Sequence, residues 1–231
     1  MIDLAERIRR DEQMDDPALD PKVYDAVLHD LARVNAWTLA ARPTLGFLKR
    51  AARGMPAFRL LDVGFGQGDM LRRIARWARR RGQAVDLVGV DLNPGSAAVA
   101  RAATPPAMPI EYRTGDYEAQ PTPFDFVVSS LVAHHMTDEE LLAFIAYMER
   151  MALRGWIIND LHRHRFAYCG FPLLAWALGV HPIVREDGQV SIGRAFRPAE
   201  WRAILARAGL PEGAARIVRR FPFRLCVERL H

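Results

Sequence analysis

A glycine-rich turn with a carboxylate on either side is the stretch of this sequence that could do chemistry. Residues 60–63 form an apolar run that ends in the turn, and a helical pattern follows from Asp69. The glycines of the turn are Gly64, Gly66 and Gly68. Without a Cβ, a residue can adopt positive φ and let a ligand approach the backbone, while free N–H groups at the helix start point toward that ligand. The pattern predicts a strand, a ligand-binding loop and a helix.

The spacing and charge of this turn indicate which ligand it suits. A dinucleotide loop has the pattern G-x-G-x-x-G and holds a pyrophosphate at the helix N-terminus. Here the pattern is G-x-G-x-G, Asp69 occupies the place of the third dinucleotide glycine, and Asp62 precedes the loop. Two carboxylates repel a pyrophosphate but attract a cofactor that carries an ammonium and a sulfonium. The loop therefore favours S-adenosylmethionine.

Two further acids follow the next two predicted strands. Asp91 ends the apolar run 85–91, where a carboxylate can accept hydrogen bonds from both ribose hydroxyls. Asp116 follows the run 109–113, where a carboxylate could accept a hydrogen bond from an adenine amine. Acids at three successive strand ends make a stronger signal for this cofactor than the glycine loop alone.

On these residues the sequence resembles the class I S-adenosylmethionine-dependent methyltransferases, from residue 60 to about residue 230. The matching segments are LLDVGFGQGD, VGVDLNP, GDYE and FDFVVSSLVAHHM. The resemblance implies that the loop glycines and Asp62 hold the methionine end, Asp91 the ribose and Asp116 the adenine. It also implies that the segment after the fourth strand faces the reactive methyl group. The expected cofactor-binding residues are Asp62, Gly64, Gly66, Gly68, Asp91, Leu92, Asp116, Tyr117 and Ser130.

Two later segments, IINDLHRHRFAY and FPFRLCVERL, look like a bacterial subgroup associated with methylation of phenolic or polyketide-like metabolites. The resemblance implies a small, largely apolar acceptor, favours O-methylation and suggests secondary metabolism. Carboxyl, nitrogen and carbon acceptors stay open. Two other classes also remain: a methyltransferase-fold binding protein without catalysis, which would usually have a decayed glycine loop, and a nucleic-acid methyltransferase. The latter should carry an N/D-P-P-Y motif after the fourth strand, where this chain has SSLVAHH.

Histidines gather where the methyl acceptor should bind. Four of the seven lie in two segments near the ends of the predicted fourth and fifth strands, at the sheet edge that binds ligands in this fold class. A phenol has a pKa near about 10, and a positioned base accelerates its reaction by about 10² to 10⁴. We predict His135 and His162 as candidate bases, with Asp160 as the residue that orients them.

The other two histidines of these segments are second choices. His134 and His164 each neighbour a favoured residue, and neighbours in an extended chain point to opposite sides. Asp160, His162 and His164 alternate in a way that could bind a metal. No further clustered acids resemble those of the metal-dependent catechol methyltransferases, so we expect no metal.

Alternating strand and helix signals predict the elements that position these residues. They indicate an α/β fold with a doubly wound, mostly parallel seven-stranded sheet that has an antiparallel end. We expect residues 1–57 to form an N-terminal helical lid and residues 58–231 to form the S-adenosylmethionine-binding core, with an insertion at about 166–195. The insertion starts with the apolar stretch 166–180. It could be a wall of the acceptor pocket, a dimer or membrane-surface patch, or an ordinary buried helix.

Composition narrows the class of protein. A chain of 231 residues that is 50% hydrophobic suits one domain with a large core. Its net charge is +5, and almost all of its basic residues are arginine. A net charge of this size is evidence about solubility more than about binding partners, so we expect no nucleic-acid partner. Two cysteines, a charged N-terminal segment and no bilayer-length apolar run predict a cytoplasmic protein without an integral membrane segment. The sequence leaves a homodimer open.

Overall fold

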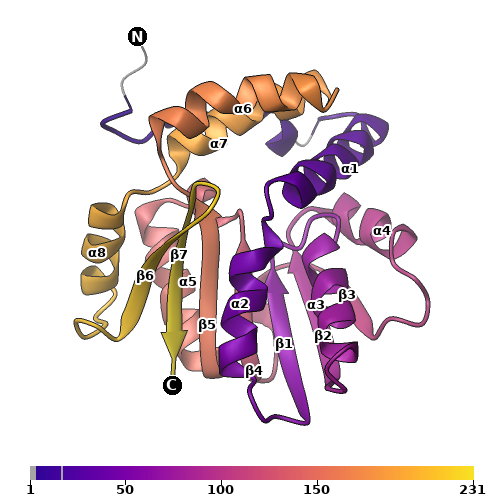
Figure 1. Cartoon of the computed structure of the whole chain (residues 1–231), viewed down its shortest axis with the longest axis vertical. Helices are drawn as coiled ribbons and strands as arrows, with labels where there is room; N and C mark the ends of the chain where they lie inside the picture. The colour runs from indigo at the N-terminus through magenta and orange to yellow at the C-terminus, as the bar shows by residue number, and fades with distance from the viewer. Residues whose placement is uncertain (1–3, 17) are drawn as a thin grey trace.

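A seven-stranded sheet forms the centre of the molecule (Figure 1). The computed structural model describes residues 4–16 and 18–231. Its strands are β1 (Ala57–Val63), β2 (Ala84–Asp91), β3 (Ile110–Thr114), β4 (Phe124–Ser130), β5 (Ala152–Leu161), β6 (Ala215–Arg220) and β7 (Arg224–Leu230). They lie in the order β3-β2-β1-β4-β5-β7-β6, with β1 to β5 parallel and β7 antiparallel to both of its neighbours. The predicted doubly wound, mostly parallel sheet is confirmed.

Helices cover both faces of the sheet. One face packs against α2 (Ala41–Ala51), α3 (Asp69–Arg79) and α4 (Pro94–Ala102), and the other against α5 (Asp138–Met151) and α8 (Pro198–Arg207). Leu71, Ile74 and Ala78 recur at helical spacing in α3 and are fully buried, and burial of each large apolar side chain contributes about 1.5 to 3 kcal/mol. These layers hold the carboxyl ends of the parallel strands in fixed positions.

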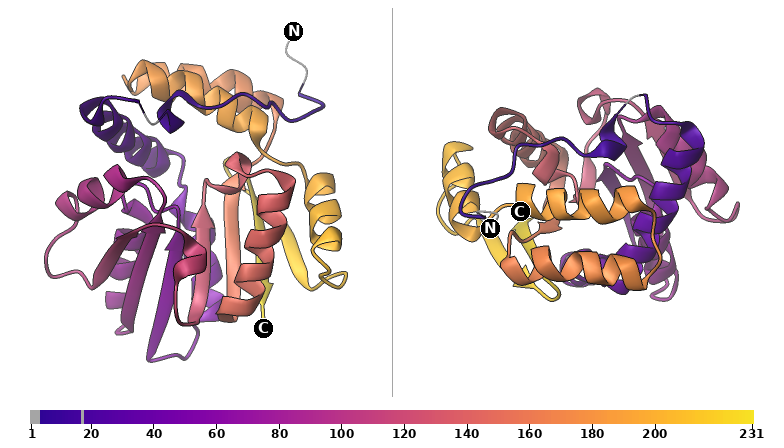
Figure 2. Two further views of the ribbon diagram at one scale, coloured as in Figure 1. Left: turned by 180° about the vertical axis from the view of Figure 1, so that it is seen from behind. Right: turned by 90° about the horizontal axis from the view of Figure 1, so that it is seen from above.

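A third group of helices lies over those strand ends. It consists of α1 (Pro21–Trp37), α6 (Arg165–Ala177) and α7 (Pro182–Arg194). Figure 2 shows α6 and α7 side by side above the sheet edge, with α1 next to them. Val27, Val34 and Val184 form a small apolar cluster of their own between α1 and α7. We call α1, α6 and α7 the cover.

The cover can be compared with the two domain boundaries predicted from the sequence. The lid predicted over residues 1–57 includes α2, but Phe47 and Leu48 of α2 are buried in the sheet cluster, so α2 belongs to the core. The insertion predicted at about 166–195 forms the helix pair α6 and α7, and its polar second half is helical as well. Within the described ranges, no helix combines the length and the apolar character that a membrane span requires.

The N-terminal segment, residues 4–16, runs across the cover and is held by buried hydrogen bonds. We call it the strap. The guanidinium of Arg163, which is buried, donates to the carbonyls of Leu4 (3.0 Å) and Ala5 (3.1 Å). The Asp187 carboxylate of α7 accepts from the N–H groups of Gln13 (2.9 Å) and Met14 (3.0 Å), in a short 3-10 turn, η1 (Gln13–Asp15). These contacts fix the strap over the carboxyl edge of the sheet.

Replacing Arg163 by Ala should release the strap. Arg163 also donates to the Ala195 carbonyl (2.7 Å) and to Glu200 (2.6 Å), so its loss removes hydrogen bonds to both the strap and α8. We expect the free energy of unfolding to fall by about 2 to 3 kcal/mol. Urea denaturation measures this loss, and limited proteolysis with mass spectrometry should show faster cleavage within residues 4–16. Arg165→Ala, on an exposed side chain, is the matched control; equal stability and cleavage in both variants would contradict the role of Arg163.

Candidate active site

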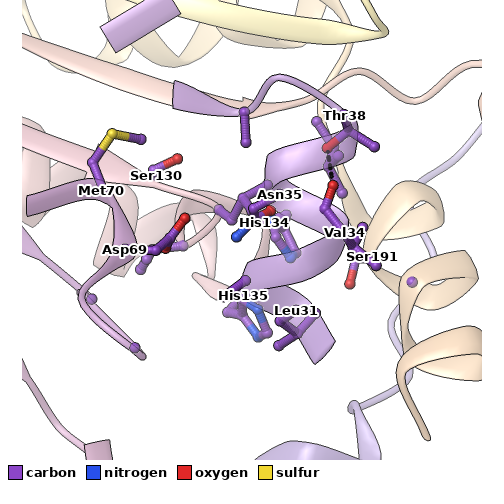
Figure 3. A pocket seen from close by; sticks show the side chains of 18 of the residues that line it. Leu31, Val34, Asn35, Thr38, Asp69, Met70, Ser130, His134, His135 and Ser191 are labelled. Carbon is purple, nitrogen blue, oxygen red and sulfur yellow. Dashed lines mark hydrogen bonds between the residues drawn. The ribbon is translucent and has the colours of Figure 1, made fainter. Parts of the chain in front are cut away.

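A cavity of about 770 Å³ lies between the carboxyl ends of the strands and the cover. Its floor comes from the loops after β1, β2 and β4, and its roof from α1, α6 and α7. Figure 3 shows side chains from these segments converging on the same space. Of the expected cofactor-binding residues, those that line it are Asp62, Gly64, Gly66, Asp91, Leu92, Tyr117 and Ser130.

The three glycines of the loop serve different purposes, although all have positive φ. A Cβ on Gly64 would lie 2.3 Å from Cγ2 of Val132, and one on Gly68 would lie 2.5 Å from the Tyr112 hydroxyl oxygen. Those two glycines are required by packing. Around Gly66 the nearest atom to a built Cβ is Cδ2 of Leu28, at 3.8 Å. Gly66 is therefore the position where the backbone is open to a ligand in the cavity.

Carboxylates of Asp62, Asp69 and Asp91 line the same part of the cavity. Asp62 is buried, and its Oδ2 atom has no hydrogen-bond partner among residues 4–16 and 18–231. Burial, reinforced by the charges of Asp69 and Asp91, raises the pKa of Asp62 well above its usual range. Burial also raises the pKa of Asp91, whose two oxygens accept the N–H groups of Gly66 and Asn93, both at 2.9 Å. An orphaned acceptor beside two further acids suits a cationic ligand.

Arg224 supplies a positive charge to the cavity and was not identified from the sequence. It begins β7, pairs with Leu161 of β5 and is 3% exposed. Nη2 donates to Oγ1 of Thr38 (3.2 Å), whereas Nε and Nη1 have no partner within the part of the chain that the structure describes. A buried guanidinium with free donors suits a carboxylate. Together with the acids, it matches the zwitterionic methionine end of S-adenosylmethionine.

The remaining expected cofactor residues lie at the rim. Asp116 is exposed and is absent from the cavity lining; its Oδ1 accepts the N–H of Glu118 (2.9 Å) at the start of η2 (Tyr117–Ala119). Its contact with adenine stays a prediction. Tyr117 lines the cavity and packs on the rings of Phe144 and Tyr147. Burial raises the pKa of Tyr117 to about 12, which keeps its hydroxyl protonated at neutral pH.

His134 and His135 both line the cavity, which corrects the expectation that they point to opposite sides. They belong to a 3-10 turn, η3 (Ala133–His135), where successive side chains do not alternate as they do in a strand, and their ring centroids are 4.3 Å apart. Figure 3 shows both rings beside Leu31 and Asn35 of α1. The prediction of opposite directions for His134 and His135 assumed an extended chain there.

The buried His134 is held between two carboxylates. Its Nδ1 lies 2.7 Å from Oδ1 of Asp160, and its Nε2 lies 3.6 Å from Oε1 of Glu12. Burial by itself would lower the pKa of His134, but Asp160 and Glu12 outweigh burial and raise this pKa to about 9. Glu12 belongs to the strap, far from His134 in sequence, and no sequence signal pointed to it.

His135 shares Glu12 with His134. Its Nε2 lies 3.7 Å from Oε1 of Glu12, and its Nδ1 lies 3.0 Å from Oδ2 of Asp15. Glu12 is buried and accepts a hydrogen bond from the Ser191 hydroxyl at 2.8 Å. Burial acts to raise the pKa of Glu12, but hydrogen bonding and the nearby histidine charge outweigh it and lower this pKa. We call Glu12, His134 and His135 the His–Glu cluster.

The prediction that His162 is a catalytic base is corrected by its position. His162 is absent from the cavity lining, and its backbone N–H donates to the Phe223 carbonyl (2.9 Å). Burial and the charge of Arg219 lower the pKa of its ring to about 4. Asp160, expected to orient His135 or His162, lies inside β5, which runs to Leu161, and bonds to His134 instead. The alternation of Asp160, His162 and His164, which could have bound a metal, is not among the groups of possible metal ligands that the described residues bring together.

A doubly wound sheet with a glycine loop and acids at successive strand ends defines the class I methyltransferases. The family model described as a methyltransferase domain matches residues 60–155. Residues 60–155 thus match a methyltransferase domain, which supports the class I S-adenosylmethionine-dependent methyltransferase that the resemblance implied. No curated protein sequence matches it at a significant level.

Similar solved structures share the fold. One is a SAM-dependent methyltransferase from Aquifex aeolicus, with a TM-score of 0.61, 18% identity and coverage of 92% of this chain and 98% of that one. Another is magnesium protoporphyrin IX methyltransferase from Synechocystis PCC 6803 with bound SAH, with a TM-score of 0.56, 20% identity and coverage of 94% of this chain and 90% of that one. A third is a plantazolicin methyltransferase in complex with a monoazolic desmethylPZN analog and SAH, with a TM-score of 0.53, 14% identity and coverage of 86% and 70%. At these identities the likeness concerns the fold.

Asp91→Ala should weaken cofactor binding. The substitution leaves ribose hydroxyls without an acceptor and removes the support of the Gly66 N–H, at a cost of about 1 to 3 kcal/mol, or roughly five- to 150-fold in Kd. Gly66→Val should weaken binding as well, because its side chain would enter the ligand space. Calorimetry measures both affinities. The control is Asp86→Ala, on the same strand but paired with Arg59 at the surface. Unchanged affinity in folded Asp91 and Gly66 variants would contradict the assignment.

Cofactor binding should release protons. Burial raises the pKa values of Asp62 and Asp91, and a bound ammonium or sulfonium favours their ionised forms. Affinity should therefore rise as the pH increases above the ordinary carboxyl range of about 4, and level off once both groups are ionised. Calorimetry in buffers of different ionisation enthalpy counts the protons, and Asp62→Asn should reduce their number. Binding without proton exchange in the wild type between pH 5 and 7 would refute this coupling.

Proposed function

We propose that the chain transfers the methyl group of S-adenosylmethionine to a hydroxyl of a small, largely apolar acceptor, of phenolic or polyketide-like type. The observation that carries this proposal is the apolar roof of the cavity that the His–Glu cluster also lines. Phe166, Phe171 and Leu174 of α6 line it, together with Leu31 of α1. Of the three interpretations of the apolar stretch 166–180, the acceptor-pocket wall accounts for these residues best.

The size and lining of the cavity support a small acceptor. Ligand cavities of about 300 to 1,000 Å³ hold small molecules, and a volume of about 770 Å³ has room for the cofactor beside a compact acceptor. The floor around Asp62, Asp91 and Arg224 is charged, and the roof is apolar. The charged floor therefore suits the charged cofactor, and the apolar roof suits the apolar acceptor.

Oxygen is the favoured acceptor atom because the apolar half of the cavity contains a group that can take up its proton. The bound cofactor supplies an activated methyl group. The acceptor hydroxyl loses its proton, its oxygen bonds to the methyl carbon, and the electron pair of the broken C–S bond stays on sulfur. The leaving thioether is neutral and needs no acid, so the protein has to align the acceptor, exclude water and accept its proton. His135, which lines the cavity and is only partly buried, is the side chain we assign to that step.

The alternative functions have less support. A binding protein without catalysis is disfavoured by the intact loop glycines and by Asp91 at the end of β2. None of the similar structures described above is named for a nucleic acid. A cytoplasmic location, a role in secondary metabolism and a homodimer stay predictions from the sequence.

A screen of phenols, quinols, carboxylates and amines with isotope-labelled cofactor, read by mass spectrometry, tests the acceptor class. We expect methylated phenols or enols among the products. Exclusive methylation of tRNA or protein would refute the proposed function, and exclusive methylation of amines would refute the choice of oxygen.

The His135→Ala variant tests the activating group. It should lower kcat by about 10² or more while cofactor affinity stays near wild type. His162→Ala, a histidine outside the cavity, should keep wild-type kcat. If His135→Ala retains most of its kcat, methyl transfer proceeds by alignment alone and the assignment of His135 is wrong.

A further inference from the structure

We propose that the His–Glu cluster binds a divalent transition-metal ion. The ligand atoms of Glu12, His134 and His135 all lie within 4.8 Å of one another, and the two Nε2 atoms are 3.6 and 3.7 Å from Oε1 of Glu12. Ligand atoms about 2.0 to 2.1 Å from a tetrahedral ion are about 3.3 Å apart. The two nitrogen–oxygen pairs therefore need only a few tenths of an ångström of contraction to hold an ion, and the two nitrogens lie within 4.8 Å of each other.

The second nitrogen of each ring supports this assignment. Nδ1 of His134 lies 2.7 Å from Asp160, and Nδ1 of His135 lies 3.0 Å from Asp15. Histidines that bind metals almost always have their other nitrogen on a carboxylate, a carbonyl or water, which fixes the ring orientation. Here two independent carboxylates, one from β5 and one from η1, leave both Nε2 atoms on the side of Glu12.

The backbone around the cluster is held independently of any ion. Arg194 donates to the carbonyls of His134 (3.2 Å) and His135 (3.1 Å), and Arg7 donates to those of His134 (3.2 Å) and Met136 (3.3 Å). These arginines stiffen η3 through main-chain oxygens. The cluster is thus a pre-formed set of donors, which lowers the ordering cost of binding an ion.

The donor set indicates which ion fits. Two imidazoles and one carboxylate form a typical zinc set, whereas Mg²⁺ and Ca²⁺ prefer oxygen ligands. Three protein ligands leave one coordination position open, and all three residues line the cavity. The proposal departs from the sequence-based expectation of no metal, because Glu12 joins the histidines only through the fold of the strap.

The site would also narrow the acceptor class, a step that rests on the proposed function. A hydroxyl that coordinates a divalent ion loses its proton far more readily than a free one. The best acceptor is then a phenol or enol, whose oxygen can take the open position; a neighbouring carbonyl or hydroxyl oxygen would add a second bond when the ion expands to five ligands. In that case His135 acts as a metal ligand, and the ion takes over the activation of the acceptor oxygen.

Metal titration of the purified chain tests the site without using turnover. The chain is stripped with chelator and titrated with Co²⁺, read by visible absorption, and with Zn²⁺, read by elemental analysis after desalting. We expect about one ion per chain. Glu12→Gln and His135→Ala should each weaken binding at least tenfold, and Asp15→Asn by about ten- to 100-fold through loss of ring orientation. His29→Ala, on an exposed histidine of α1, is the matched control and should bind as wild type.

The outcomes separate the metal site from the proposed function. Circular dichroism and thermal melting establish whether each variant is folded. If an alanine variant is not folded, the test rests on the conservative Glu12→Gln variant. Absence of ion binding by the wild type, or equal binding by folded Glu12→Gln and wild type, overturns the metal site. In that case a proton, and no metal ion, lies between His134 and Glu12. Methyl transfer to phenols by a metal-free enzyme would leave the proposed function standing, whereas ion binding without any methyl transfer would overturn only the function.

Discussion

The buried carboxylate of Asp160 joins the sheet to the candidate catalytic groups. It accepts a hydrogen bond from the backbone N–H of His134 (2.8 Å) and also contacts the ring of His134. One side chain of β5 therefore fixes both the turn after β4 and the imidazole of that turn. Burial acts to raise the pKa of Asp160, but the nearby His134 charge outweighs burial and lowers this pKa. A buried charge of this kind is stable only while its partner remains. The fold and the site thus depend on the same pair.

The cavity is divided electrostatically between its two expected ligands. On the floor, three acids face a ligand space that also contains the unpartnered donors of Arg224. Under the cover, apolar side chains of α1 and α6 share the lining with the His–Glu cluster and with polar residues such as Asn35 and Ser191. Excluding water from such a space strengthens each remaining charge interaction, because the local dielectric constant falls.

Sequence patterns predicted the parts of this site that depend on local structure. The run that ends at Asp62, the glycine loop and the acid at Asp91 each follow from a strand and the turn after it. Glu12 and Arg224 were missed because only long-range packing brings them to the cavity. The direction of His134 was missed because a 3-10 turn replaced the extended chain that was assumed.

The positions of the strap and β7 in the chain affect the order in which the site forms during synthesis. Glu12 and Arg224 both line the cavity, although Glu12 is synthesised early and Arg224 late. Both residues lie outside the methyltransferase domain match over residues 60–155. A nascent chain that has already folded β1 to β5 would have its glycine loop but neither Glu12 docked under α7 nor the guanidinium of β7. Acceptor activation, which needs Glu12 docked on α7, and complete cofactor recognition, which needs Arg224, would therefore both mature after the glycine loop has formed.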